Sequence, residues 1–332
     1  MRKSIAASVI VLLCLGVAQA QDKKISLMVA TGGLGGVYYY YGTTVAEIIS
    51  KTTGYEATAI QTAASVDNIM LIQKRTDPKA NIYYLGLILP DSAILAFKGE
   101  HEKFKASPAK DLRILWAMYS NYIHIVTKAD SGIKKLSDLK GKRVSTGAPG
   151  SGTEVEAFMI LEAGGVKVAD LAKQERLGAA ESAEALASGT IDAYFWSGGL
   201  PTASITELAT TLSRKGAKLA MVTLKPDEDV VKNIHAKYPG VCEPGVIPKS
   251  VYNTDEDTPT LVFWNLFMCS EALPEAAAYN ITKAVFTNLS QLHNAVKPSK
   301  ETTLENAVKF LTGAIPYHPG AVKYFKEAGA IK

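Results

Sequence analysis

The sequence predicts an α/β protein of two lobes with a ligand cleft between them, and three observations support this fold class. Apolar strand-like runs alternate with helical patterns along most of the chain, which is typical of a parallel sheet. The length of 332 residues suits two lobes of ordinary size. Small-residue loops recur where a strand ends and a helix begins, and α/β proteins bind ligands at that edge of the sheet.

The N-terminus has the pattern of a secretory signal peptide. Two basic residues precede an apolar run at residues 5–17, and Ala18-Gln19-Ala20 fits the small-x-small cleavage rule. We expect residues 1–20 to be removed and the mature chain to begin at Gln21, in the periplasm. An uncleaved anchor is the alternative, although the apolar run is too short for a membrane span.

The charge and the cysteine content limit the possible functions and the state of the thiols. Lysine and arginine number 36 against 32 aspartate and glutamate, without a basic stripe, so the chain carries no nucleic-acid footprint. Cys242 and Cys269 remain after the leader. In an oxidising compartment such an even pair is expected within disulfide reach, and two buried free thiols are the alternative.

The first half begins with the stretch that organises the chain. A strand at residues 25–29 leads into four glycines between residues 32 and 36, and then into a helix with Val45, Ile48 and Ile49 on one face. Ser65 is placed to cap a second helix. The remaining elements expected here are strands at 56–60, 82–89, 112–118 and 122–127, and a helix opening at Pro90.

The second half repeats the theme. Thr153 and Glu156 fit a capping box at the start of a helix, and Pro201 is placed in the first turn of another. The other elements expected are strands at 144–145, 191–196, 219–224 and 261–268, and helices at 180–188, 274–293, 303–311 and 320–328.

The loops together favour an anion site. Each helix N-terminus offers unpaired backbone N–H groups and about half a positive charge. Several such ends on facing lobes can bind a carboxylate without an arginine. The dinucleotide motif G-x-G-x-x-G fails because Tyr38 occupies a glycine position, and the P-loop ending is absent, so no cofactor is expected.

The arginines fall away from this edge in the predicted elements. Arg75 and Arg214 lie at helix ends, while the other three lie before or at the beginning of strands: Arg113, Arg143 and Arg176. We therefore expect no arginine clamp on the ligand.

Catalytic patterns are missing from the sequence. The five histidines have no metal-ligand spacing, and no G-x-S-x-G elbow surrounds Ser145 or Ser151. Glu154 and Asp192 could form an acid/base pair, but helix and strand positions explain them more simply. A structural role is expected for His318. The chain is therefore expected to be a non-enzyme without a metal, and a secreted enzyme acting on a small carboxylic acid in the same cleft is the alternative.

Several motifs resemble one family of receptors. They are TGGLGGVYY at 31–39, SVDN at 65–68, ADSGI at 129–133, DLKGKRVS at 138–145, GAPGSGTE at 147–154, GTIDA at 189–193, LPTA at 200–203 with ITELA at 205–209, and IPYHPGA at 315–321. These runs are similar to the TAXI-type (TRAP-associated extracytoplasmic immunogenic) solute receptors of TRAP transporters, over nearly the whole mature chain.

The resemblance implies a type II periplasmic-binding-protein fold without enzymatic activity. It also implies delivery of a small organic anion, such as glutamate or a 2-oxoglutarate-like carboxylate, to the integral membrane subunits of a TRAP transporter. Lobe one is expected to combine residues 23–117 with 226–332, and lobe two to hold 118–225. The ligand, the coupling ion and the oligomeric state stay open.

The loops and the resemblance together indicate a ligand-binding set. Its members are Gly35, Gly36, Val37, Tyr38, Ser65, Asn68, Gly150, Ser151, Gly152, Thr153, Gly198 and Gly199. The chain departs from the family at Leu34 and Val37, where hydroxyl residues are common, and at Tyr40-Tyr41 in place of Pro-Leu. A larger or more apolar acid is therefore an alternative ligand. Of the four tyrosines at 38–41, at most two can face a cleft.

Overall fold

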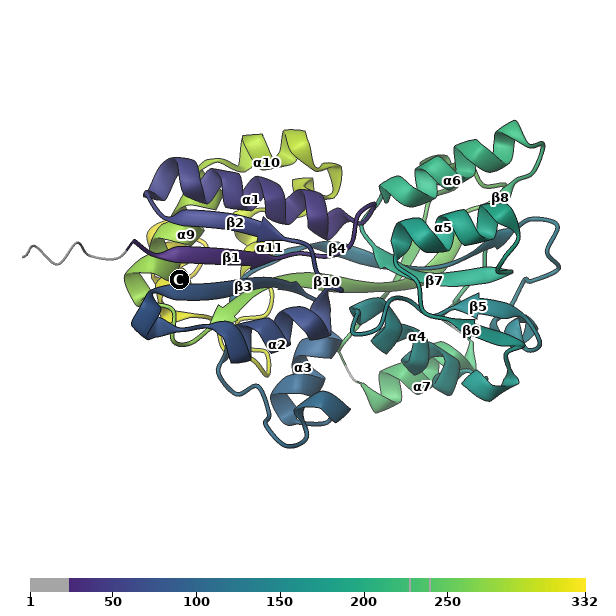
Figure 1. The fold of residues 1–332 in the computed structure, drawn as a ribbon, viewed down its shortest axis with the longest axis horizontal. Helices are drawn as coiled ribbons and strands as arrows, with labels where there is room; N and C mark the ends of the chain where they lie inside the picture. Colours follow the sequence, from purple (N-terminus) through teal and green to yellow (C-terminus); the bar gives the residue numbers. More distant parts are fainter. Residues whose placement is uncertain (1–23, 227, 239) are drawn as a thin grey trace, which may run out of the picture.

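The computed structural model describes residues 24–226, 228–238 and 240–332, and within them the strands form one ten-stranded sheet (Figure 1). The strands are β1 (Ser26–Ala30), β2 (Glu56–Ile60), β3 (Ile82–Ile88), β4 (Leu112–Lys128), β5 (Arg143–Ser145), β6 (Lys173–Glu175), β7 (Ala193–Gly198), β8 (Leu219–Met221), β9 (Glu243–Ile247) and β10 (Thr258–Ser270). Their order is β2-β1-β3-β10-β4-β7-β5-β6, with β8 paired to β4 and β9 to β10.

The sheet is parallel at both ends and antiparallel in the middle. β1 runs parallel to β2 and β3, with Ser26 opposite both Glu56 and Ile82. β5 runs parallel to β6 and β7 at the other end. The long strands β4 and β10 run antiparallel to each other and to their outer neighbours. The parallel α/β arrangement is thus confirmed for each end of the sheet, and an antiparallel pair joins the two ends.

Most helices follow the strands as expected. They are α1 (Val37–Thr53), α2 (Ser65–Arg75), α3 (Pro90–Lys98), α4 (Gly152–Ala163), α5 (Ala179–Ser188), α6 (Ala203–Arg214), α7 (Asp229–Lys237), α8 (Lys249–Tyr252), α9 (Glu275–Thr287), α10 (Leu289–Ala295), α11 (Leu304–Ala307) and α12 (Pro319–Glu327). The helix expected over 274–293 is interrupted at Asn288, which leaves the helical conformation. Pro201 precedes α6 instead of lying in its first turn.

The structure tests the expectation about membrane spans, but it does not test the one about the signal peptide. The expected signal peptide at residues 1–20 lies outside the described residues. Within residues 24–226, 228–238 and 240–332, no helix is both long enough and apolar enough to cross a bilayer.

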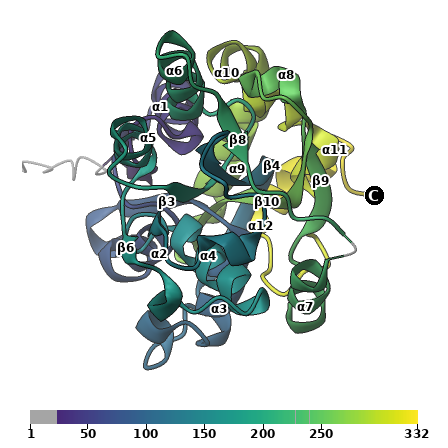
Figure 2. The ribbon, with the colours of Figure 1, turned by 90° about the vertical axis from the view of Figure 1, so that its right-hand side faces the viewer.

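The apolar side chains gather in three clusters. The first joins β1, β3 and α1 to α9 and α12, and it fills the lobe that contains both ends of the described chain. In the other lobe, α4 and α7 pack on one face of the sheet, and α5 and α6 pack on the other. Figure 2 faces this second lobe and shows the two helix pairs on opposite sides of its strands.

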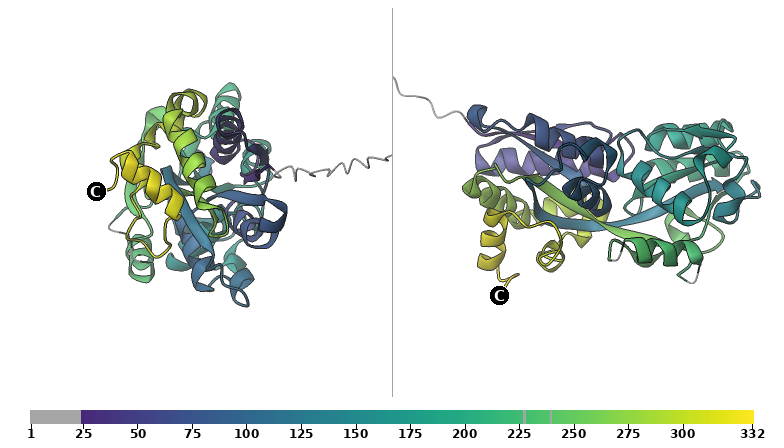
Figure 3. Two further views of the ribbon diagram at one scale, coloured as in Figure 1. Left: turned by 90° about the vertical axis from the view of Figure 1, so that its left-hand side faces the viewer. Right: turned by 90° about the horizontal axis from the view of Figure 1, so that it is seen from below.

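Two long strands connect the lobes, as the right-hand view of Figure 3 shows for β4 and β10. The two strands expected at 112–118 and 122–127 are one strand, because Ser120 and Asn121 keep pairing with Trp264 and Phe263 of β10. The register shifts between Trp264 and Leu266, where Met118 and Tyr119 of β4 lie opposite the single residue Asn265, which marks a β-bulge in β4. A bulge bends its strand, so the sheet changes direction where the lobes meet.

The cores suggest a division of the chain that differs from the expected one. Tyr119 packs in the first cluster, and Ile123 packs in the second. On the return path, residues as late as Phe263 lie in the second cluster, and Leu266 lies in the first. We therefore propose that the chain crosses between lobes near Asn121 and Asn265, so that residues 226–263 belong to lobe two instead of lobe one.

The expected proximity of the two cysteines is wrong. Cys242 lies in the second cluster and Cys269 in the first, and both are buried free thiols. The even count of cysteines carried no information about distance, because the crossing at Asn265 separates the two residues.

Candidate ligand-binding cleft

A small cavity lies between the lobes where the strands of both parallel groups end. Its walls come from the glycine loop before α1, the loop before α2, the start of α4 and the end of β7. Its volume is about 80 Å³, and since one water needs roughly 10–15 Å³ on this measure, the space suits a compact organic molecule.

The glycine loop brings the N-terminus of α1 to the cavity. Gly36 is the N-cap of α1 without a side-chain cap, and it lines the cavity with Val37 and Tyr38. A Cβ on Gly36 would lie 3.0 Å from the Trp196 ring of the other lobe. Gly35 does not line the cavity; its carbonyl accepts from the Ser204 amide at 3.4 Å, and its φ of 78° favours glycine.

The consecutive tyrosines at 38–41 lie in α1, so their side chains point to different sides of the helix. Tyr38 faces the cavity, Tyr41 is fully buried in the first core cluster, and Tyr40 is 45% exposed. The Tyr41 hydroxyl contacts Thr302 at 3.1 Å and accepts from the Trp116 indole at 3.1 Å. Of the four tyrosines, Tyr38 alone lines the cavity.

The loop before α2 contributes Ser65 and holds the site together through Asn68. Ser65 lines the cavity, but it is not a cap: its hydroxyl accepts from the Leu89 amide at 3.0 Å. The Asn68 amide donates to the carbonyls of Thr31 and Leu87, each at 2.8 Å. Asn68 does not line the cavity; from the first turn of α2 it ties the end of β1 and the end of β3 together behind the site.

The start of α4 supplies two hydroxyls. The cap is Ser151 rather than Thr153, because the Ser151 hydroxyl accepts from the Glu154 amide at 3.0 Å. The Thr153 hydroxyl accepts from the Ser197 amide at 3.3 Å. Both hydroxyls line the cavity, and each keeps its own hydrogen for a further acceptor.

Glycines allow α4 to approach the first lobe. A Cβ on Gly152 would come within 2.5 Å of the Leu89 side chain and 2.6 Å of the Ser65 hydroxyl. Gly152 lines the cavity. Gly150 lies outside the lining and adopts a φ of 81°, and its amide donates to the Glu154 carboxylate at 3.1 Å.

At the end of β7 only one of the two expected glycines reaches the cavity. Gly198 lines it, and a Cβ there would collide with the Trp196 indole nitrogen, which donates to the Thr202 hydroxyl at 3.0 Å. Gly199 packs against Pro298 and Tyr119 instead. Its role is close packing at the junction of the lobes.

The lining residues that the sequence analysis did not select include Tyr119, Asn121 and Trp196. Trp196 ends an expected strand, and Tyr119 and Asn121 fall in the expected gap between the strands at 112–118 and 122–127. Tyr119 and Asn121 lie where β4 crosses between the lobes. The Tyr119 hydroxyl is buried and has no hydrogen-bond partner among the described residues. Burial raises the pKa of Tyr119 well above its ordinary value, so this hydroxyl is a neutral donor at the cavity wall.

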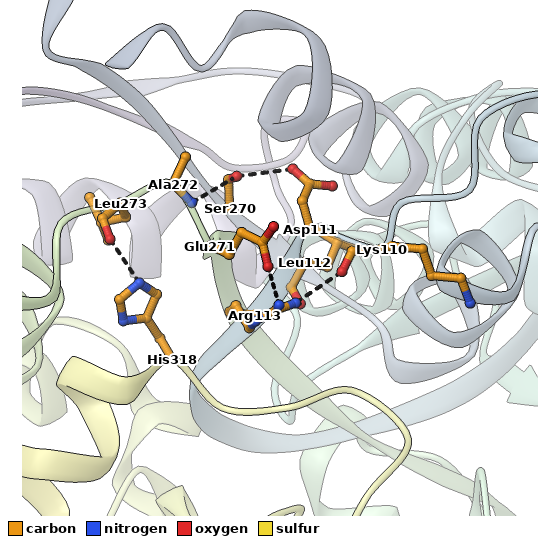
Figure 4. A network of polar contacts seen from close by, with 9 residues as sticks. All are labelled: Lys110, Asp111, Leu112, Arg113, Ser270, Glu271, Ala272, Leu273 and His318. Carbon is orange, nitrogen blue, oxygen red and sulfur yellow. Dashed lines mark hydrogen bonds and ion pairs between the residues drawn. The ribbon is translucent and has the colours of Figure 1, made fainter. Parts of the chain in front are cut away.

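No lysine or arginine side chain of the described residues lines the cavity. Arg143 pairs with Asp192 at 2.6 Å, and Arg75 and Arg214 end α2 and α6. Arg113 contacts Glu271 at the beginning of β4, and Figure 4 shows His318 nearby, with its ring in contact with the Leu273 carbonyl at 2.8 Å. The His318 ring also accepts from the Gly320 amide at the start of α12. The structural role predicted for His318 is confirmed by this cap.

The position expected for Arg176 is wrong. It follows β6 and so lies at the carboxyl end of its strand, instead of at the beginning. Its guanidinium pairs with Glu154 at 2.5 Å, which neutralises it beside the start of α4.

Comparison with known proteins adds a family and a fold. Residues 29–329 match the family model described as NMT1-like. MatC from Rhodopseudomonas palustris, with bound malate, is 15% identical with a TM-score of 0.54, covering 84% of this chain and 89% of that one. The periplasmic binding protein BugD is 14% identical with a TM-score of 0.54, covering 92% and 97%. An R. palustris protein with adipate is 14% identical with a TM-score of 0.51, covering 94% of each chain. At these identities the similarity shows the periplasmic-binding-protein fold.

Proposed function

The chain belongs to the NMT1-like family, and from this membership and its cleft we propose that it is an extracytoplasmic solute receptor for a small organic anion. The cleft lies between two lobes, which can close on a ligand by a hinge motion at Asn121 and Asn265. We propose a receptor instead of an enzyme, because the polar groups at the cavity are hydroxyls, amides and backbone N–H groups, which bind an anion but supply no nucleophile–base pair.

One observation carries the proposal: the N-termini of α1, α2 and α4 meet at a cavity that no cationic side chain of the described residues lines. Each terminus presents unpaired backbone donors and the positive end of a helix dipole. A carboxylate accepts such donors at about 1.5–3 kcal/mol for each hydrogen bond. The hydroxyls of Ser151, Thr153 and Tyr119 add side-chain donors.

The ligand class follows from this chemistry and from the volume of the cavity. We propose a carboxylate of glutamate or 2-oxoglutarate size, and the malate and adipate held by two proteins of the same fold support a dicarboxylate. Tyr38, Tyr119 and Trp196 give the cavity aromatic walls, which suit the carbon chain of such an acid.

The finer assignment rests on the sequence motifs. We propose that the chain is a TAXI-type receptor that delivers its ligand to TRAP membrane subunits from the periplasm. The ligand-binding set includes Gly36, Val37, Tyr38, Ser65, Ser151, Gly152, Thr153 and Gly198, which line the cavity. Gly35, Asn68, Gly150 and Gly199 support it from behind.

The test is identification of the bound molecule. Protein purified without added acids is denatured, and the released small molecules are identified by mass spectrometry. A panel of mono- and dicarboxylates is then scanned for an increase in melting temperature, with the matching amides as controls. Stabilisation by carboxylates and not by amides supports the proposal. A neutral or cationic co-purified ligand, with no response to any acid, overturns it.

A further inference from the structure

Two carboxyl groups from opposite lobes lie buried behind the cleft. Asp91 is in the first turn of α3 in lobe one and is 2% exposed. Glu156 is in the second turn of α4 in lobe two and is fully buried. α3 and α4 contact each other across the lobes, so this pair is covered only while the two lobes are together.

None of the four carboxyl oxygens has a hydrogen-bond partner among the described residues. Among the described residues, no ion pair includes Asp91 or Glu156. The titratable groups whose pKa values are raised by both carboxylates are Tyr38 and Cys242, which are themselves acids. Asp91 also borders a groove lined by Lys98, His101, Glu162 and Lys237. Lys237 is paired there with Glu162 at 2.9 Å.

Two buried carboxylates without a counter-charge are strongly unfavourable, because each has lost its hydration. Either a proton or a cation must neutralise part of the charge. Within the residues that the structure describes, no group of three or more His, Cys, Asp and Glu side chains could hold a metal ion. The proton is therefore the favoured partner.

We propose that Asp91 and Glu156 form a proton-binding latch between the lobes, which takes up a proton when the lobes close and releases it when they open. The inference rests on the proposed receptor function, because lobe closure is the step that buries the pair. Its consequence is that ligand affinity and pH are linked.

The electrostatics of the pair agree with this geometry. Burial raises the pKa of Asp91 to about 7, although nearby backbone amides lower it in part. Burial and the charge of Asp91 raise the pKa of Glu156 well above its ordinary value, although the neighbouring Ser197 hydroxyl lowers it in part. Opening the lobes returns water to both groups and moves their pKa values back towards about 4.

The sign follows from linkage. Because the closed form has the higher pKa values, it binds more protons than the open form between pH about 4 and about 7. Closure is therefore fully supported below about pH 4, and this support is lost as the pH rises through about 7. Affinity for an acid that is already ionised should fall with rising pH, by up to about tenfold per pH unit for one proton.

The experiment measures the dissociation constant of 2-oxoglutarate by calorimetry from pH 5 to 8 for the wild type, Glu156→Gln and Glu162→Gln. Glu162 lies on the same helix and is exposed to solvent, so its variant is the matched control. We expect the affinity to fall across this range in the wild type and in E162Q, and to vary less in E156Q. Equal slopes in the wild type and E156Q overturn the proposal.

A second measurement needs no ligand. Small-angle scattering of the ligand-free protein gives the radius of gyration over the same pH range. A radius that increases with pH in the wild type, and increases less in E156Q, supports the latch even if 2-oxoglutarate does not bind. If 2-oxoglutarate binds and both proteins keep one radius and one affinity slope, the latch is wrong while the receptor function stands. If E156Q does not fold, Asp91→Asn replaces it in both arms.

Discussion

The Tyr38 hydroxyl donates a 2.6 Å hydrogen bond to the side-chain carbonyl of Asn265, 227 residues later in the chain. This contact joins the start of α1 to the residue of β10 that lies opposite the bulge in β4, where the chain changes lobe. The Asn265 amide in turn donates to the Tyr119 carbonyl at 2.9 Å and to the Asn121 side chain at 3.2 Å. One asparagine thus connects the cavity wall to both crossing strands.

Removal of that contact should weaken both the fold and the site. Tyr38→Phe leaves a buried acceptor on Asn265 without its donor, so we expect a loss of about 1–3 kcal/mol in the free energy of unfolding. Urea denaturation measures it. Tyr40→Phe is the control, because Tyr40 is 45% exposed and outside this network. Equal stabilities of the two variants would contradict the role given to Asn265.

Substitution of the two hydroxyls at the start of α4 should weaken ligand binding. Ser151→Ala with Thr153→Ala removes two donors to a charged group, and we expect a loss of about 2–3 kcal/mol, or about 30- to 150-fold in affinity. The lost Ser151 cap should cost about 1 kcal/mol of stability. Calorimetry measures the affinity, and Thr210→Ala on the exposed face of α6 serves as control. Unchanged affinity would place the site elsewhere.

A methyl group at Gly152 should hold the lobes apart. The added Cβ would meet Leu89 at 2.5 Å and Ser65 at 2.6 Å, both on the other side of the cavity. Overpacking of this kind costs about 1–3 kcal/mol, and opening the lobes relieves it. We expect Gly152→Ala to have a larger radius of gyration by scattering and a weaker affinity. Gly33→Ala should keep the compact radius, because nothing lies within 4 Å of its added Cβ.

Arginine substitutions should leave binding nearly intact. None of the five described arginines lines the cavity, and three of them are paired with acids. We expect each Arg→Gln variant to change the affinity by less than about tenfold, roughly 1.4 kcal/mol, at low and at high salt. A larger loss in a folded variant, above all Arg176→Gln, would show that an arginine acts on the ligand.

The cysteines should react only after unfolding. Burial raises the pKa of Cys242 to about 12, and Cys269 is fully buried with a pKa raised further. Both thiols are therefore protonated and covered at pH 8. A thiol reagent should label neither in native protein that lacks residues 1–20, and both after denaturation without reductant. Absence of labelling in the denatured protein would indicate a disulfide.

The sequence was most informative where the backbone geometry requires a particular residue type. Glycines with small neighbours predicted the loops that meet at the cavity, because only glycine permits approaches such as that of Gly152 to Leu89. The parallel strands β1 to β3 were predicted because each apolar run is followed by a helix signal.

Long-range pairing could not be predicted in this way. The residues near Ser120 resemble a break between two strands, and only the partner strand β10 makes them continuous. Tyr119 falls in this apparent break and Trp196 ends an apolar strand, so neither position indicated a ligand site, yet both line the cavity. Asn68 shows the opposite case: it was expected to bind the ligand, yet its side chain in the first turn of α2 donates to the backbone carbonyls of Thr31 and Leu87.

The place of β10 in the sheet has a consequence for the order in which the chain can fold. β10 lies between β3 and β4, so the N-terminal third of the chain cannot complete its own sheet until residues 258–270 have been synthesised. The third cluster, whose buried residues lie between Val126 and Tyr252, precedes β10 and can gather earlier, since its contacts are nearer in sequence. A chain that stops before β10 would therefore expose the edge of β3, whose unpaired backbone groups could pair with a strand of another molecule.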